Sequence, residues 1–107
     1  MTNDPLLQPY QLKHLTLKNR VMSTAHEPAY SEGGLPLDRY RLYHREKAKG
    51  GIALTMTAGS AIVSRDSPEA FGNLHAWRDE IVAPMKRLVD DCHDEGCAVM
   101  IQLTHLG

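Results

Sequence analysis

The chain has 107 residues, which allows at most one domain at about 150 residues per domain. Hydrophobic residues make up 42% and charged residues 23%, which excludes collagen-like, coiled-coil and wholly disordered chains and predicts a packed core. Twelve Lys and Arg against thirteen Asp and Glu give a net charge of −1, so neither nucleic acid nor an anionic membrane is expected as a partner.

The ends of the chain and its cysteines indicate the compartment. The first five residues lack the basic and apolar segments of a secretion signal, and the longest uncharged run, 50–64, is too short and too polar to span a bilayer. We therefore expect a cytoplasmic protein. Cys92 and Cys97 have no second pair that would complete a metal site, so we expect two buried free thiols.

The first third of the chain predicts a hairpin, a strand and a loop. Residues 10–18 alternate apolar and polar side chains around a central Lys-His pair, as a short hairpin does. Residues 19–25 then predict a short strand. The segment 26–37 holds two prolines and two glycines, which predicts a loop, and loops of this length are usually functional.

A first helix is predicted over 38–49. Asp38 suits the positive end of its dipole, Lys47 and Lys49 suit the other end, and the glycines at 50–51 stop it. The residues expected near its buried face are Tyr40, Tyr43 and Ala48.

The rest of the chain predicts a strand, a long connection, a helix and a last strand. The uncharged run 52–57 is typical of a strand covered on both sides, and 58–78 is expected to be a connection. The second helix covers about 80–95, with Pro84 in its first turn. Its apolar stripe is Ile81, Met85, Leu88, Val89 and Cys92. A third buried strand follows at 98–103.

This order predicts an α/β fold: a short β-hairpin followed by β-α-β-α-β, with helices long enough to connect parallel strands. No closing helix follows the third strand. We therefore expect the sequence to be the N-terminal, incomplete part of a larger fold.

Three short clusters follow the predicted strands, at 23–27, 57–60 and 102–105. Ligands of parallel α/β folds gather at the carboxyl ends of the strands. The amide of Gln102 both donates and accepts hydrogen bonds, which suits an imide edge such as N3–H and C2=O of a flavin. Each cluster also has a purely structural interpretation, because Gln102 could satisfy loop backbone, 58–59 could form a bulge, and His26 could be an ordinary loop histidine.

Taken together, Leu17-Lys-Asn-Arg20, Lys49-Gly-Gly51 and Gln102-Leu-Thr-His-Leu-Gly107 resemble the N-terminal part of the old yellow enzyme family of FMN oxidoreductases. The resemblance implies a (β/α)₈ TIM barrel with FMN at the carboxyl ends of its strands. Residues 1–107 would then be an incomplete N-terminal part of that FMN-binding domain, since such a barrel needs about 250 residues. The hairpin would close the bottom of the barrel.

The same resemblance implies the site residues. His26 would tune the flavin by stabilising negative charge on the reduced ring, and Gln102 would hydrogen-bond its pyrimidine edge. His105 begins a stretch similar to the family's His-x-Gly-Arg motif and is expected near the substrate or behind the residues that touch it. No metal ligand is expected. The implied cofactor-binding residues are Ser23, Thr24, Ala25, His26, Ala58, Gly59 and Gln102.

His26-Glu-Pro28 and the segment 64–68 look most like the multidomain branch of the family, which contains trimethylamine and dimethylamine dehydrogenases, dienoyl-CoA reductase and N-methylproline demethylases. This implies a longer protein that also carries a [4Fe-4S] iron–sulfur cluster and binds FAD or NAD(P)H, with homo-oligomers expected. Glu27 stands where trimethylamine dehydrogenase attaches its flavin through a cysteine, so covalent FMN is not expected.

The function implied is hydride transfer between a small-molecule substrate and flavin N5. The first reaction is oxidative demethylation of an N-methyl amine such as an N-methylproline, and the alternative is NAD(P)H-dependent reduction of an activated C=C bond of the enoate or dienoyl-CoA type. Two other classes stay open. A metal-dependent barrel hydrolase could use His26, Glu27 and His105 as ligands, and a non-catalytic α/β module would need a finished sheet.

Overall fold

The computed structural model describes the backbone of residues 3–107 and the side chains of these residues other than 58–60. Among the described residues, no helix is long and apolar enough to cross a membrane. The elements in chain order are η1 (Pro5–Leu7), β1 (Tyr10–Leu12), β2 (Leu15–Leu17), β3 (Met22–Ser23), α1 (Asp38–Lys49), β4 (Leu54–Ile62), β5 (Leu74–His75), η2 (Asp79–Ile81), α2 (Val82–Asp94) and β6 (Ala98–Thr104).

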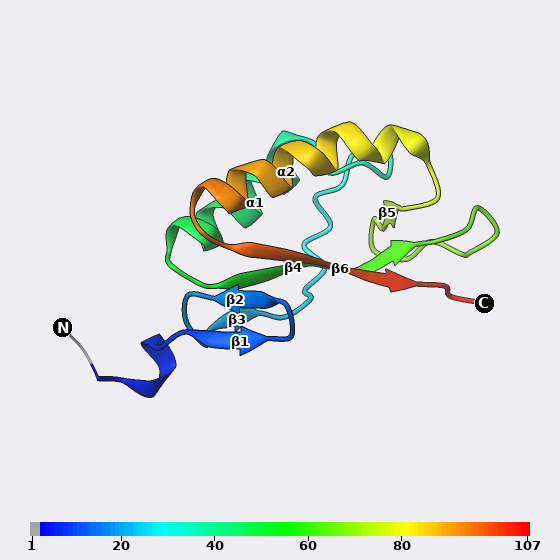
Figure 1. Ribbon diagram of the computed structural model, residues 1–107. Helices are drawn as coiled ribbons and strands as arrows, with labels where there is room; N and C mark the ends of the chain where they lie inside the picture. Colours follow the sequence, from blue (N-terminus) through cyan, green and yellow to red (C-terminus); the bar gives the residue numbers. More distant parts are fainter. Residues whose placement is uncertain (1–2) are drawn as a thin grey trace.

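The predicted hairpin is present as β1 and β2, which pair antiparallel with Tyr10 opposite Leu17. It lies at the amino ends of the central strands (Figure 1). There Leu17 lines a shallow hollow together with Ala53 and Ala98. The Lys18 ammonium donates a 2.7 Å hydrogen bond to a backbone carbonyl at the end of α2, which ties the hairpin to the main body.

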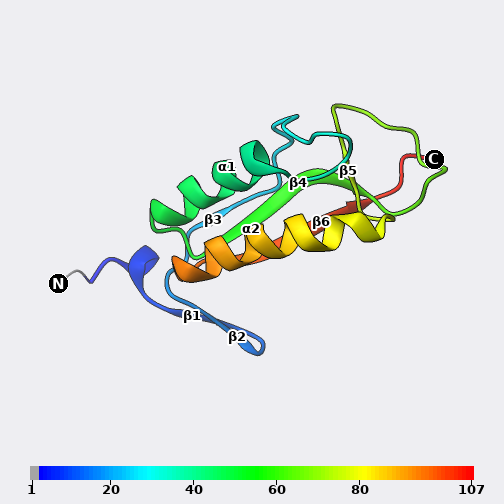
Figure 2. The ribbon, with the colours of Figure 1, turned by 90° about the horizontal axis from the view of Figure 1, so that it is seen from above.

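β4 is the central strand of a parallel sheet. β3 pairs with its first residues, Leu54 and Thr55, and β6 pairs along most of its length. β5 pairs with Ala61 and Ile62, which β6 also contacts, so β5 must lie on the edge of β4 opposite β6, further along from β3. Both helices cover the same side of this sheet (Figures 1 and 2). The predicted hairpin followed by β-α-β-α-β in a parallel sheet is confirmed.

The first strand is shorter than the predicted 19–25. The Asn19 side chain accepts a hydrogen bond from the Val21 amide and donates to the Gly51 carbonyl, so it forms a turn before the strand begins. Further along the same edge, β5 pairs with Ala61 and Ile62 of β4. Pairing of β3 with β4 is thus limited to Met22 and Ser23.

The second strand starts later and ends later than the predicted 52–57. It runs through Ile62, so the predicted connection 58–78 is wrong at its start and also contains β5. Three residues of β4 between Thr57 and Ala61 are matched by the single residue Gln102 of β6, and pairing resumes beyond this register shift. A bulge of this kind lets a strand continue through small residues that the sequence pattern suggests as its end.

The helices agree closely with their predictions. α1 has the predicted bounds, although its fully buried residues are Tyr40, His44 and Ala48, with Tyr43 only half-buried. These three are spaced four apart and form one helical face. α2 begins with the short turn η2 and places Pro84 in its first turn, where a missing N–H leaves no hydrogen bond unmade.

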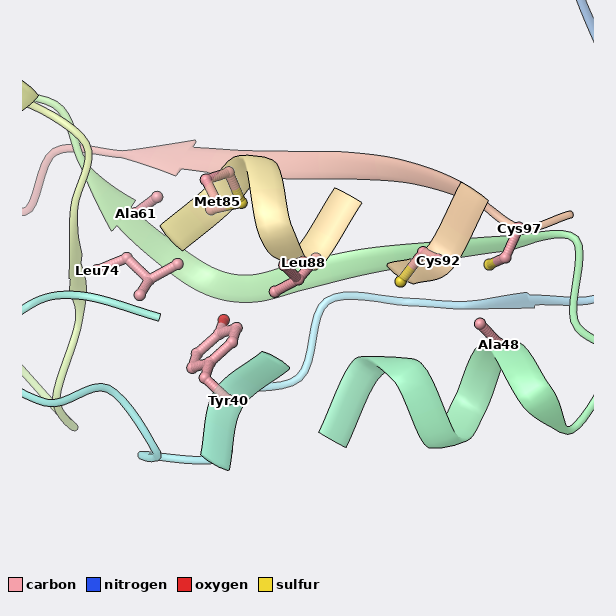
Figure 3. Packing of buried hydrophobic residues seen from close by; sticks show 8 residues of the cluster. All are labelled: Tyr40, Ala48, Ala61, Leu74, Met85, Leu88, Cys92 and Cys97. Atoms are coloured by element: carbon pink, nitrogen blue, oxygen red, sulfur yellow. The ribbon is translucent and has the colours of Figure 1, made fainter. Parts of the chain in front are cut away.

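The core fills the space between the sheet and the two helices (Figure 3). Leu88 of α2 lies next to Tyr40 of α1 in this layer, Cys92 lies further along toward Cys97, and Leu74 of β5 closes the opposite end. Cys92 and Cys97 are both buried free thiols, as predicted, and burial raises the pKa of Cys92 to about 12. At that pKa the thiol stays protonated at neutral pH and packs as an apolar side chain.

Candidate functional site

The sheet has one face covered by helices and one that they leave free. Thr55 and Thr57 of β4 are buried on the helix side, where His44 Nδ1 lies 2.8 Å from the Thr55 hydroxyl. Because side chains alternate along a strand, Met56 lies on the opposite face. The residues beside it on the neighbouring strands share that face.

Gln102 belongs to the helix-free face. Its neighbours Ile101 and Leu103 are in register with Thr57 and Ala61, so alternation places Gln102 on the other side, together with Met100. Gln102 is exposed, and its side-chain amide makes no hydrogen bond within the part of the chain that the structure describes. A donor and an acceptor are therefore available to a ligand on this face.

The register shift lies directly opposite Gln102. It confirms the bulge interpretation of the 57–60 cluster and leaves its binding role untested. The predicted contacts at Ala58 and Gly59 lie outside the residues whose side chains are described. The sheet nevertheless brings two of the three predicted clusters to the same level of neighbouring strands.

The carboxyl end of β3 is held by α1. Ser23 is half-buried, and its hydroxyl accepts a 2.7 Å hydrogen bond from the Lys47 ammonium. Thr24 is exposed, and Ala25 is half-buried. The Ser23 hydroxyl is thus occupied within the protein, and Thr24 continues the alternation toward the helix-free face.

His26 is exposed, and its Nδ1 lies 3.3 Å from the Tyr43 hydroxyl. The Lys47 ammonium lies 4.4 Å from the centre of the Tyr43 ring. Sequence reasoning did not single out Tyr43 and Lys47 as site residues. Their spacing of four places them on one helix face, which was the available signal, but nothing local in the sequence shows what that face touches.

His44 is the other residue that the motifs did not reveal. It is fully buried, its Nε2 has no hydrogen-bond partner among the described residues, and burial together with the charge of Lys47 lowers its pKa to about 4. The ring is therefore neutral at neutral pH and packs 5.3 Å from the Tyr40 ring, measured between ring centres.

His105 lies away from the sheet face described above. Its Nε2 is 3.2 Å from an Asp66 carboxylate oxygen, and hydrogen bonds from Ser64 and His105 lower the pKa of Asp66. This contact ties the end of β6 to the connection that follows β4. His26 and His105 thus have separate partners, and the described residues contain no group of three or more His, Cys, Asp or Glu side chains placed to hold a metal ion.

Solved structures share this arrangement. The complex of 2-naphthoyl-CoA reductase with 2-naphthoyl-CoA matches with a TM-score of 0.89 and 25% sequence identity, over 96% of this chain and 16% of that chain. The fold is accordingly the N-terminal part of the (β/α)₈ barrel of old yellow enzymes.

Curated proteins match along the whole chain. The protein named "Probable N-methylproline demethylase" from Rhizobium meliloti (strain 1021) is 65% identical over 107 residues, and "Multifunctional alkene reductase/demethylase OYE" from Caballeronia cordobensis is 51% identical over 106 residues. The chain spans 16% of the length of each of these relatives. The model of the NADH:flavin oxidoreductase / NADH oxidase family matches residues 5–107, and the chain belongs to this family.

Proposed function

We propose that residues 1–107 form the N-terminal part of the FMN-binding barrel of a longer oxidoreductase. The proposed reaction is the oxidative demethylation of an N-methyl amine such as an N-methylproline. The observation that carries it is the 65% identity, over all 107 residues, to a protein named as an N-methylproline demethylase.

The residues present fit a flavin. Among the described residues, the Gln102 amide is exposed and has no hydrogen-bond partner on a sheet face that α1 and α2 leave uncovered, so it can meet both a ring N–H and a ring carbonyl. Met100, two residues before Gln102, lies on the same face and adds apolar surface beside it. Thr24 and His26 follow the adjacent strand end and would contact the ring from that side.

The chain's own residues would bind and orient, and bound FMN would supply the redox chemistry. The chemistry that bound FMN would supply is the two-electron oxidation of the N-methyl carbon by hydride transfer to the flavin, after which water would convert the oxidised substrate into formaldehyde and the secondary amine. Gln102 would hold the pyrimidine edge. His26 would supply a hydrogen-bond donor where negative charge develops.

Reduction of an activated C=C bond is the second candidate function. It is favoured by the 51% identical relative, whose name includes both an alkene reductase and a demethylase. Both reactions use the same flavin position, so the residues of this chain alone do not separate them.

The proposal is tested by comparing N-methylproline with NADPH and an activated alkene as substrates of the full-length protein. The full-length protein is purified, its bound flavin is released and identified, and the holoenzyme is reduced anaerobically with N-methylproline. We expect stoichiometric FMN, rapid bleaching of the flavin and one formaldehyde per flavin reduced. Reduction by NADPH followed by turnover of an enone or a dienoyl-CoA, without formaldehyde from N-methylproline, would support the alkene reductase instead.

The remaining expectations extend the proposal to the longer protein. A [4Fe-4S] cluster and a bound FAD or NAD(P)H would carry electrons onward from the flavin. Iron and flavin analysis of the full-length protein tests whether these groups are present. A cytoplasmic location and a homo-oligomeric state stay predictions of the sequence.

A further inference from the structure

Helix α1 holds the last residue of β3 and the segment that follows it, at one point each. The Lys47 ammonium donates to the Ser23 hydroxyl at 2.7 Å, and the Tyr43 hydroxyl lies 3.3 Å from His26 Nδ1. Tyr43 and Lys47 are four residues apart and so lie on the same face of the helix. One helix face therefore sets the position of the strand end and of the histidine that follows it.

The Tyr43 ring is itself fixed on several sides. Tyr30 and His44 pack edge-on against it, with ring centres 5.6 Å and 5.2 Å away, and the Lys47 ammonium lies 4.4 Å from its centre. A ring held in this way presents its hydroxyl at one place. The exposed His26 side chain is thus anchored through a rigid partner, although it follows a strand of only two residues.

The contact can fix the hydrogen position on His26, because the Tyr43 hydroxyl engages one of the two ring nitrogens. A neutral imidazole has one N–H donor and one acceptor nitrogen, and the partner of one nitrogen decides which is which. A tyrosine hydroxyl that donates to Nδ1 makes Nδ1 the acceptor and places the hydrogen on Nε2. Within the described residues Nε2 has no partner, so with the Tyr43 hydroxyl as donor the N–H at Nε2 is left for a ligand.

We infer that Tyr43 is a positioning residue that holds His26 as an Nε2–H hydrogen-bond donor toward the ligand at the carboxyl end of β3. The identity of that ligand as a flavin rests on the proposed function. A fixed donor next to the ring stabilises the negative charge of the reduced flavin and so raises its reduction potential. Tyr43 would act on the flavin only through His26.

The test uses the full-length, FMN-loaded protein and four variants: Tyr43→Phe, His26→Ala, the double variant, and Tyr10→Phe as a matched control on the exposed hairpin. We expect Tyr43→Phe to lower the ratio of reduced to oxidised flavin at a given potential by up to tenfold, which is about 30 mV for a two-electron couple. His26→Ala should lower it at least as far. The double variant should match His26→Ala, and Tyr10→Phe should match the wild type.

A second measurement does not depend on the flavin or on the folding of a variant. Nitrogen NMR of histidine-labelled wild-type protein, with and without FMN, reports which His26 nitrogen carries the hydrogen. We expect the Nε2–H tautomer, and an Nδ1–H tautomer would overturn the inference. A Tyr43→Phe shift that persists in the His26→Ala background would also overturn it, because the effect would not pass through His26.

Failure of the proposed function gives a different result. A full-length protein that retains no FMN would refute the flavin as the ligand, both in the proposed function and in the inference about His26. An FMN-loaded protein that demethylates N-methylproline but has an unchanged potential in Tyr43→Phe would refute the inference alone.

Discussion

Gln102 carries the most direct residue-scale prediction, because its amide is exposed and has no partner among the described residues. Gln102→Leu keeps the size of the side chain and removes both hydrogen-bonding groups. Leaving the flavin's imide edge unpaired costs roughly 1–3 kcal/mol, which corresponds to about 5- to 150-fold weaker FMN binding. Fluorescence titration of FMN into the full-length apoprotein measures this.

The control for this change is Gln8→Leu, an equal substitution in the exposed lead-in before the hairpin. It should leave FMN affinity unchanged. Equal affinities for the Gln102→Leu and wild-type proteins would remove Gln102 from the candidate site.

The buried histidine gives a prediction of pH dependence. Burial lowers the pKa of His44 from 6.5 to about 4. Between these values the unfolded chain binds a proton at this residue and the folded chain does not, so the free energy of unfolding falls as the pH falls from about 6.5 to about 4. His44→Gln retains a polar group beside Thr55 and should remove this part of the pH dependence.

Urea unfolding of the full-length protein between pH 7 and pH 4.5 tests the His44 prediction. His14→Gln, at the exposed hairpin turn, is the matched control and should keep the wild-type pH profile. Superimposable profiles for His44→Gln and the wild type would contradict the assignment of a buried neutral imidazole.

At the scale of elements, one ion pair joins the two helices. The Arg41 guanidinium contacts the Asp91 carboxylate, both side chains are about four-fifths buried, and hydrogen bonding to Asp91 raises the pKa of Arg41. Among the described residues, Asp91→Asn leaves the guanidinium with the exposed Asp38 as its remaining charged partner. We expect a loss of about 1–3 kcal/mol in the free energy of unfolding, between the costs typical of exposed and fully buried pairs.

The neighbouring pair Lys86–Asp90 on the same helix supplies the control. Both of its side chains are mostly exposed, so Asp90→Asn should change stability by less than about 1 kcal/mol. Chemical unfolding of the two variants side by side measures the difference. Equal effects would show that the Arg41 contact adds nothing beyond a surface ion pair.

The elements also show which parts of this fold are readable from sequence. α1 was predicted at both ends because Asp38 and the glycines at 50–51 mark them locally. The predicted end of the second strand, at 57, falls short of the observed end of β4. Small residues within a strand look like a loop when the register shift against the partner strand is unknown. β5 was missed because two residues carry no periodic pattern.

The candidate site divides in the same way. Gln102 and His26 were found because they stand next to strand ends, which a linear pattern can locate. The contact of Tyr43 with His26 joins residues 17 apart and exists only after α1 has packed on the sheet. Such a contact depends on tertiary packing, so residue spacing alone could not predict it.

At the scale of the whole molecule, the described part of the chain is less compact than a typical domain. Its radius of gyration is 14.6 Å, against about 13 Å for a compact domain of 100 residues. Apolar side chains of β6 remain open to solvent: Met100 is 40%, Ile101 is 44% and Leu103 is 61% exposed. Ile101 and Leu103 also border an apolar hollow beside α2.

These exposed groups decide how residues 1–107 behave when expressed alone. An unpaired strand edge with apolar side chains is a template for association, and the exposed patch offers a second contact surface. FMN cannot offset this, because ligand stabilisation requires a folded site that binds, and barrels of this type place a phosphate site after their seventh and eighth strands. We expect the isolated chain to be oligomeric or aggregated, to retain no FMN and to show no activity above free flavin.

Size-exclusion chromatography with light scattering, thermal unfolding and the visible absorbance of the purified chain together test this expectation. The full-length protein, purified in the same buffer, is the control and should elute as a defined species with bound flavin. A monomer of residues 1–107 with a sharp cooperative melt and one FMN per chain would contradict this expectation. The open face of the sheet would then be a complete FMN site that does not need the rest of the barrel.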